Sequence, residues 1–307
     1  MRRAPVLLTL LLVVVGTTAL VDPAAGGEPP PTPDVEVTDV GTAPRRLLRL
    51  DVSKGDEFTT SFTLRFGLEQ EIEGETRAAP IPPIRYELAC SVTKVNDVGR
   101  VTYTFTVEEL EAVDDGTVES SVLDRVADQL EDLAGLEGEV TVTARGVLVE
   151  SDIEIPSGLD AAVRASLQQL SQQLSSLTIP YPRDRVGVGA TWTATTALEA
   201  GGIDTDLVYS YELREFDGNA YVVGVGYEQT AEPQDVDLPG VPDDAGVRLE
   251  EFDVSGSGEM SGELTSPLST SGTLSAAGDQ VFTADDEEEE LRQSLSIDLV
   301  IESRRGE

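Results

Sequence analysis

Alternating apolar side chains over short segments are the feature that most constrains how this 307-residue chain folds. In the segment 291–301, apolar side chains stand at Leu295, Ile297, Leu299 and Ile301. Such alternation places one apolar row on one face of a β-strand. We therefore expect a final strand there, and further strand segments at 47–52, 58–66, 86–95, 101–107 and 208–227.

Turn residues indicate how these segments connect. Asn96-Asp-Val-Gly99 and Asp217-Gly-Asn219 each separate two apolar runs, which predicts two hairpins. The two hairpins also have similar sequence patterns, so we expect two similar halves, about 45–155 and 180–307, in one continuous antiparallel sheet.

Two segments have helical periodicity instead. In 118–136 and in 159–177, apolar residues recur every three or four positions. The second segment follows a capping box at Ser157-Gly-Leu-Asp160. Each helix would have one apolar stripe, and such a stripe has to be covered by a sheet.

These patterns predict an α+β fold that is mainly β. We expect a large curved antiparallel sheet, a half-barrel, with the two amphipathic helices packed on its concave face. An apolar ligand would lie between sheet and helices. Its lining would be Val122, Val126, Leu130, Leu167, Leu170 and Leu174. The alternative is a closed core formed by the same residues, as apolar helix stripes usually form.

The N-terminus has the pattern of an export signal. Arg2 and Arg3 precede an apolar run at 6–15, and small residues follow it. We expect a signal peptide at 1–27, a proline-rich tether at 28–44 and a single β-rich domain at 45–307. The protein would then be secreted or lie in the cell envelope. If the signal is not cleaved, the same run would be a membrane anchor.

Charge excludes several functions. The net charge is -37 and the chain contains no histidine. Histidine-dependent triads and zinc sites are therefore excluded, and we assign no catalytic residue, no metal ligand and no cofactor. Nucleic acid and anionic lipid are bound through Lys/Arg clusters, which we expect this chain to lack.

Some acidic and buried residues leave alternatives open. The loops 235–244 and 285–290 are acidic enough for an irregular calcium site, although solvated loops have the same composition. Paired carboxylates would allow a hydrolase. Cys90 and Trp192 lie in apolar strand patterns, where we expect a buried thiol and a core anchor.

One segment carries a resemblance. Residues 180–192, Pro-Tyr-Pro-Arg-Asp-Arg-Val-Gly-Val-Gly-Ala-Thr-Trp, are similar to a pattern in an uncharacterised family of exported actinobacterial β-rich proteins. That family has no established activity, so the resemblance implies no functional residue. The order of strands and helices also looks remotely like the half-barrels of periplasmic lipoprotein carriers and mycobacterial lipid-binding lipoproteins. Those hold acyl chains between sheet and helices, but this chain lacks their lipobox cysteine.

The sequence therefore favours an exported non-enzymatic protein of the cell envelope that binds a lipid or another apolar small molecule. The alternatives are a structural or protein-interaction domain with a closed core and, behind it, a carboxylate-based hydrolase. The sequence leaves the oligomeric state open.

Overall fold

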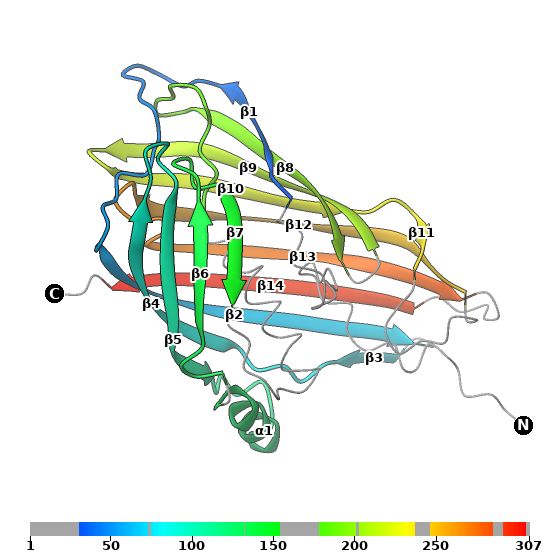
Figure 1. Cartoon of the computed structure of the whole chain (residues 1–307). Helices are drawn as coiled ribbons and strands as arrows, with labels where there is room; N and C mark the ends of the chain where they lie inside the picture. Colours follow the sequence, from blue (N-terminus) through cyan, green and yellow to red (C-terminus); the bar gives the residue numbers. More distant parts are fainter. Residues whose placement is uncertain are drawn as a thin grey trace, which may run out of the picture.

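The structure is a computed structural model of the whole chain (Figure 1). It describes residues 31–72, 75–131, 133–153, 178–200, 203–236, 246–284 and 291–304. The expected signal peptide, the second expected helix at 159–177 and most of both acidic loops lie outside these residues.

The described residues form mainly β-structure with one helix. The helix is α1 (Ser120–Glu131). The strands are β1 (Asp34–Asp39), β2 (Glu57–Ile72), β3 (Glu75–Ala78), β4 (Ile84–Val95), β5 (Val101–Ala112), β6 (Glu137–Val142), β7 (Leu148–Ile153), β8 (Thr191–Ala200), β9 (Ile203–Asp217), β10 (Ala220–Thr230), β11 (Gln234–Asp235), β12 (Val247–Glu263), β13 (Ser271–Ala284) and β14 (Leu291–Arg304).

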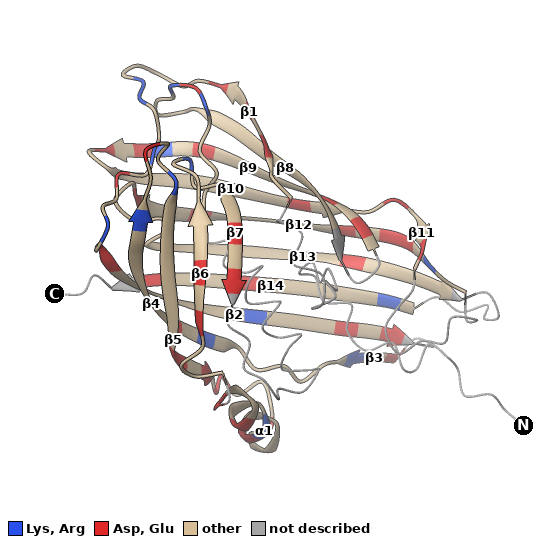
Figure 2. Cartoon of the chain, viewed as in Figure 1, with Lys and Arg blue, Asp and Glu red and all other residues tan. Residues whose placement is uncertain are grey.

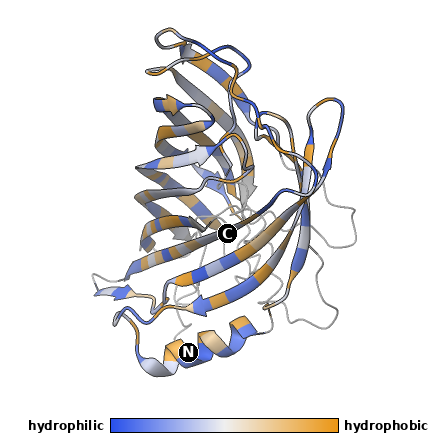
Figure 3. Cartoon of the chain, turned by 90° about the vertical axis from the view of Figure 1, so that its left-hand side faces the viewer, coloured by the Kyte–Doolittle hydropathy of each residue, from blue (hydrophilic) through white to orange (hydrophobic). Residues whose placement is uncertain are grey.

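All of these strands belong to one antiparallel sheet that is not closed. Its order is β1-β8-β9-β10-β12-β13-β14-β2-β4-β5-β6-β7, with β3 beside β2 and β11 beside β12. The sheet bends so strongly that β4 to β7 cross in front of the long strands β9 to β14 (Figures 1 and 3). The expected large, curved, antiparallel sheet is confirmed.

The two expected hairpins are confirmed at their turns. Gly99 has a φ of 76°, and the Asn96 side chain accepts hydrogen bonds from the backbone N–H groups of Val98 and Arg100. Gly218 has a φ of 59° between β9 and β10. Both glycines adopt the left-handed region that other residues avoid, so the turn residues fix these connections locally.

Glycines in β12 and β13 allow their backbones to approach closely. A Cβ added to Gly258 would lie 1.9 Å from the Thr273 carbonyl oxygen, and one on Gly278 would lie 1.9 Å from the Asp253 carbonyl oxygen. No side chain fits there, so the strands can coil where a Cβ would hold them apart.

Buried apolar side chains from different parts of the sheet pack together in shared clusters. One core cluster contains Tyr103 and Val140 from the β4–β7 arm together with Trp192, Tyr211 and Tyr221 from β8 to β10. Because these strands cross, side chains from distant parts of the sheet meet in one interior. The predictions of a buried Trp192 and a buried Cys90 are confirmed, since they are 1% and 4% exposed. Burial raises the pKa of the Cys90 thiol to about 12, so it stays protonated at neutral pH.

Helix α1 does not lie across the concave face, so the expected position of the first helix is wrong. It lies beyond the ends of β4 and β5 (Figures 1 and 3) and contacts β5. Leu130 is its buried residue, while Val122 and Val126 are half-buried. The bent sheet already covers the core, and the short helix covers only one end of β5.

The strand expected at 47–52 is also absent. The backbone of this segment bonds to two different loops and not to one neighbouring strand: Leu50 N–H donates to the Ala144 carbonyl and Asp51 N–H to the Leu264 carbonyl. Leu48 is fully buried, which explains the apolar pattern without a ladder.

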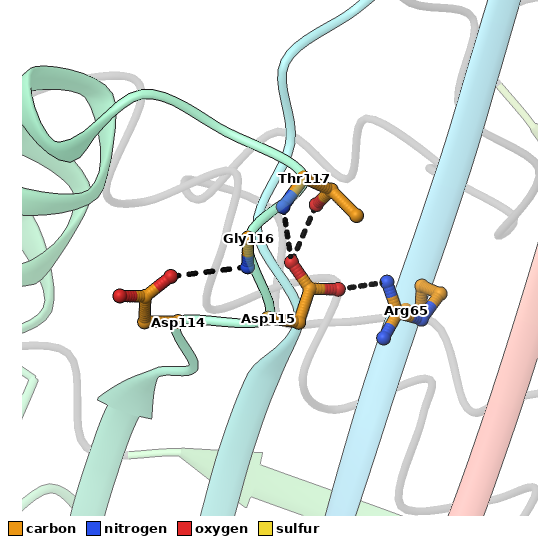
Figure 4. Close-up of polar contacts among 5 residues, drawn as sticks. All are labelled: Arg65, Asp114, Asp115, Gly116 and Thr117. Carbon is orange, nitrogen blue, oxygen red and sulfur yellow. Dashed lines mark hydrogen bonds and ion pairs between the residues drawn. The ribbon is translucent and has the colours of Figure 1, made fainter.

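The connection from β5 to α1 is held by a short acidic turn (Figure 4). The Asp115 carboxylate accepts bonds from the Thr117 N–H at 2.9 Å and the Thr117 hydroxyl at 2.5 Å, and it forms an ion pair with Arg65 on β2. The Asp114 carboxylate accepts a bond from the Gly116 N–H at 3.1 Å. The turn therefore ties the start of the helical segment to the sheet.

We predict an acid-sensitive contribution from this turn. The hydrogen bonds from Thr117, more than the charge of Arg65, lower the pKa of Asp115 to about 2. Because the folded pKa lies below the unfolded one, the stabilisation is present above about pH 4 and is lost as the pH falls toward 2. An NMR titration should show this pKa, and Thr117→Val should raise it more than Arg65→Gln does. An equal shift in both variants would contradict the assigned cause.

The Tyr103 hydroxyl gives a second prediction. Tyr103 is fully buried, and its hydroxyl has no hydrogen-bond partner among the described residues. Tyr103→Phe should therefore leave the free energy of unfolding in urea unchanged or raise it by up to about 1 kcal/mol. The control is Tyr221→Phe, which removes the acceptor of a buried 2.8 Å bond from the Tyr181 hydroxyl and should cost about 1 kcal/mol. Equal losses in the two variants would show that the Tyr103 hydroxyl is satisfied.

Candidate functional site

The expected apolar lining is brought together only in part. Leu130 belongs to the main core cluster and Val126 packs against it. Val122 is half-buried on the same helix. The other three expected residues, Leu167, Leu170 and Leu174, lie outside the described residues. The described part of the lining therefore packs against the core at the end of β5.

A different site is built on the segment 178–190. This segment lies between the two arms of the bent sheet, strands β4–β7 on one side and the long strands β8–β14 on the other. Trp192, at the start of β8, donates a 3.0 Å hydrogen bond from its indole nitrogen to the Pro180 carbonyl. Tyr181 donates its buried hydroxyl to Tyr221 and packs edge-on against that ring. These contacts with buried aromatic side chains hold the backbone of the segment 178–190 in place.

Three arginines meet on this fixed backbone, and we call Arg49, Arg145 and Arg183 the arginine cluster. Arg49 donates to the carbonyl oxygens of Pro182 at 2.8 Å and Arg183 at 3.0 Å. Arg145, in the β6–β7 turn, donates to the Tyr181 carbonyl at 3.2 Å. The cluster thus joins three segments that are far apart in the sequence.

The cluster keeps its positive charge. Burial and then the neighbouring Arg145 lower the pKa of Arg49, and burial and then Arg183 lower the pKa of Arg145. A guanidinium stays protonated at neutral pH despite such shifts. The carbonyl groups that accept hydrogen bonds from Arg49 and Arg145 are neutral, so they orient these side chains without neutralising their charge. Like charges are therefore held close together.

Ion pairs occur elsewhere on the sheet but not here. Across the described ranges, the arginines paired with carboxylates are Arg65, Arg77, Arg85, Arg214, Arg248 and Arg292. None of the three cluster arginines has such a partner in that part of the chain. In a chain with a net charge of -37, this local lack of carboxylate partners is the unusual feature.

More basic side chains surround the cluster. Arg46 lies 5.1 Å from the centre of the Phe216 ring and donates to the Gly218 carbonyl at 3.1 Å. Lys and Arg residues lie at this end of the molecule, upper left in Figure 2, together with Asp and Glu residues. We call this region the basic end, and its residues are Arg45, Arg46, Arg49, Lys54, Lys94, Arg100, Arg145, Arg183 and Arg185.

The expectation that the chain lacks an arginine cluster is therefore wrong. Arg45-Arg46 followed by Arg49, and Arg183 followed by Arg185, were visible local signals in the sequence. Their meaning depends on contacts between the segments. Leu50 N–H donates to the Ala144 carbonyl at 2.8 Å, and Arg46 and Val186 exchange backbone hydrogen bonds at 2.9 Å.

Other kinds of site receive little support from the residues that the structure describes. Among them, no three His, Cys, Asp or Glu side chains are grouped so that they could hold a metal ion. Within the same ranges no helix is both long and apolar enough to cross a membrane. Residues 237–245 and 285–290, the greater part of the acidic loops, lie outside them.

Comparisons with family models, with curated proteins and with solved structures gave no match to this chain. The resemblance of residues 180–192 to exported actinobacterial proteins therefore stays a prediction.

A glycine beside the cluster gives a testable prediction. Gly146 has a φ of 70°, and an added Cβ would lie 2.5 Å from the Ile179 carbonyl oxygen. Gly146→Ala should therefore destabilise the protein and separate the β6–β7 turn from the segment 178–190. The matched control is Gly189→Ala, where φ is 84° but a Cβ would meet nothing within 4 Å.

The control should cost only the left-handed penalty of about 1–2 kcal/mol, whereas Gly146→Ala should cost clearly more. Urea unfolding of both variants measures the difference. Equal costs would show that the two segments are not in close contact.

Proposed function

We propose that this chain is an exported, non-enzymatic protein of the cell envelope that binds an anionic group at the arginine cluster. The observation that carries the proposal is the set of three guanidinium groups without a carboxylate partner among the described residues. The N-terminal signal pattern supports export. The raised pKa of Cys90, about 12, argues against a nucleophilic thiol.

The cluster has the chemistry of an anion site. A guanidinium presents a planar fork of N–H donors that matches the oxygens of a phosphate or a carboxylate. Arg49 and Arg145 are held by backbone carbonyls, so little of their rotamer freedom remains to be lost on binding. Arg183 is exposed and can reach the ligand from solvent.

Charge in the cluster also favours a ligand. Burial and, after it, the like charge of a neighbouring arginine lower the pKa values of Arg49 and Arg145, so like charges repel there. An anion between them would relieve this repulsion. Binding should therefore weaken with added salt, as expected for groups that remain accessible to solvent.

A second candidate function is binding of a lipid or another apolar ligand on the concave side of the sheet, in a half-barrel arrangement. The open, curved sheet favours it. It depends on the helix that the sequence predicts over 159–177. Native mass spectrometry of the purified protein tests it, because a co-purifying lipid is expected and a ligand-free, tightly packed protein would exclude it.

We predict that the purified protein binds tripolyphosphate at low salt. Isothermal titration calorimetry should show that Arg145→Gln or Arg183→Gln weakens binding by about tenfold, the value of one lost charged hydrogen bond. The control is Arg292→Gln on β14, which removes an arginine that lies 3.7 Å from Glu251 and should leave binding unchanged. A similar loss in all three variants would indicate attraction by overall charge and exclude the cluster as the site.

A further inference from the structure

Exposed apolar side chains gather at the basic end. Five large hydrophobic side chains are exposed among the described residues. Four of them, Leu47, Val95, Val98 and Val188, lie in the same loops as the basic residues. Val98, at the tip of the β4–β5 turn, is 76% exposed. An apolar side chain at a turn tip gains nothing from water, so this surface fits a partner that covers it.

Contacts show that these loops share one end of the molecule. A Cβ on Gly99 would lie 3.0 Å from the Ala144 Cβ, so the β4–β5 turn touches the β6–β7 turn that carries Arg145. Thr42 N–H donates to the Val188 carbonyl at 2.9 Å, which joins the loop after β1 to the segment 178–190. The apolar tips therefore surround the arginine cluster.

The basic end also concentrates the lysines. The chain has only two lysines, Lys54 and Lys94, and the segments that carry them are joined by the 2.8 Å bond from Gly55 N–H to the Val92 carbonyl. Carboxylates are present at this end as well. Its carboxylates include Asp39, Asp51, Asp56, Glu57, Asp97, Asp184, Glu215 and Asp217. Within the described chain none of them forms an ion pair with the arginine cluster, which therefore remains available.

Part of the acidic charge lies at the opposite end of the long strands. β12 has 17 residues and spans about 55 Å at 3.3 Å per residue. Glu250, Glu251 and Asp253 lie near one end of β12. Glu259 and Glu263 lie near the other end, next to Leu264, whose carbonyl accepts a hydrogen bond from the Asp51 N–H. Charges at the far end of β12 are screened over that distance at moderate salt, so the groups next to the arginine cluster decide what it binds.

We propose that the basic end is a docking surface for an anionic lipid bilayer. Val98, Leu47 and Val188 would enter the headgroup region while the arginine cluster binds lipid phosphates. Exposed apolar side chains flanked by Arg and Lys favour a bilayer over a soluble anion, because a soluble anion would leave the exposed valines in water. The inference rests on the proposed function, since the bound anionic group is here a lipid phosphate.

The test is flotation of the exported protein with vesicles. Vesicles of phosphatidylglycerol and phosphatidylcholine in equal amounts should carry the protein, whereas pure phosphatidylcholine should not. Val98→Asp should weaken binding by about tenfold, the effect of withdrawing one buried valine. The double variant Arg183→Gln/Arg185→Gln should weaken it at least as much and reduce its dependence on salt.

The matched control is Val300→Asp, which makes the same substitution at a valine that is 40% exposed on β14. It should float like the unmodified protein. Near-ultraviolet circular dichroism of the buried Trp192 confirms that each variant is folded.

The outcomes separate the two proposals. Binding of tripolyphosphate without flotation, or equal flotation of Val98→Asp and Val300→Asp, would overturn membrane docking and leave the anion site in place. Binding of neither tripolyphosphate nor anionic vesicles would overturn both. Flotation that depends on Val98 and on the arginines supports both.

Discussion

The burial of the concave face is the constraint on which the rest of this structure depends. A single sheet is stable only if its apolar face is covered, and here the sheet covers much of that face by bending over itself. Tyr103 on β5 and Trp192 on β8 belong to strands on different arms, yet they share one core cluster. The bend also carries the β6–β7 turn to the segment 178–190, and this juxtaposition creates the arginine cluster.

Local signals predicted the parts of the fold that are decided locally. The hairpin turns at 96–99 and 217–219 rest on glycines with positive φ, so short sequence patterns identify them. The segment 47–52 shows the limit of such patterns. Leu48 is buried by tertiary packing without any strand pairing, and alternation alone cannot distinguish the two cases.

The candidate site was less predictable for the same reason. Arg49, Arg145 and Arg183 come from separate segments, and only the crossing of the two arms brings them together. The net charge of -37 gave no indication of this cluster, because a total charge does not show where the positive side chains lie. The apolar stripe of α1 was real, but its place at the end of β5 depends on which surface the bent sheet left uncovered.

The pairing of β14 with β2 has a consequence for how the protein is made. β14 joins the first long strand to the rest of the sheet through a register that runs from Arg292–Glu71 to Arg304–Thr59. Because β14 is the last strand of the described chain to be synthesised, β2 and β13 each lack a neighbour until then. Such long-range pairing makes folding slow and leaves strand edges open to aggregation. Completion of the sheet must therefore follow translation of β14.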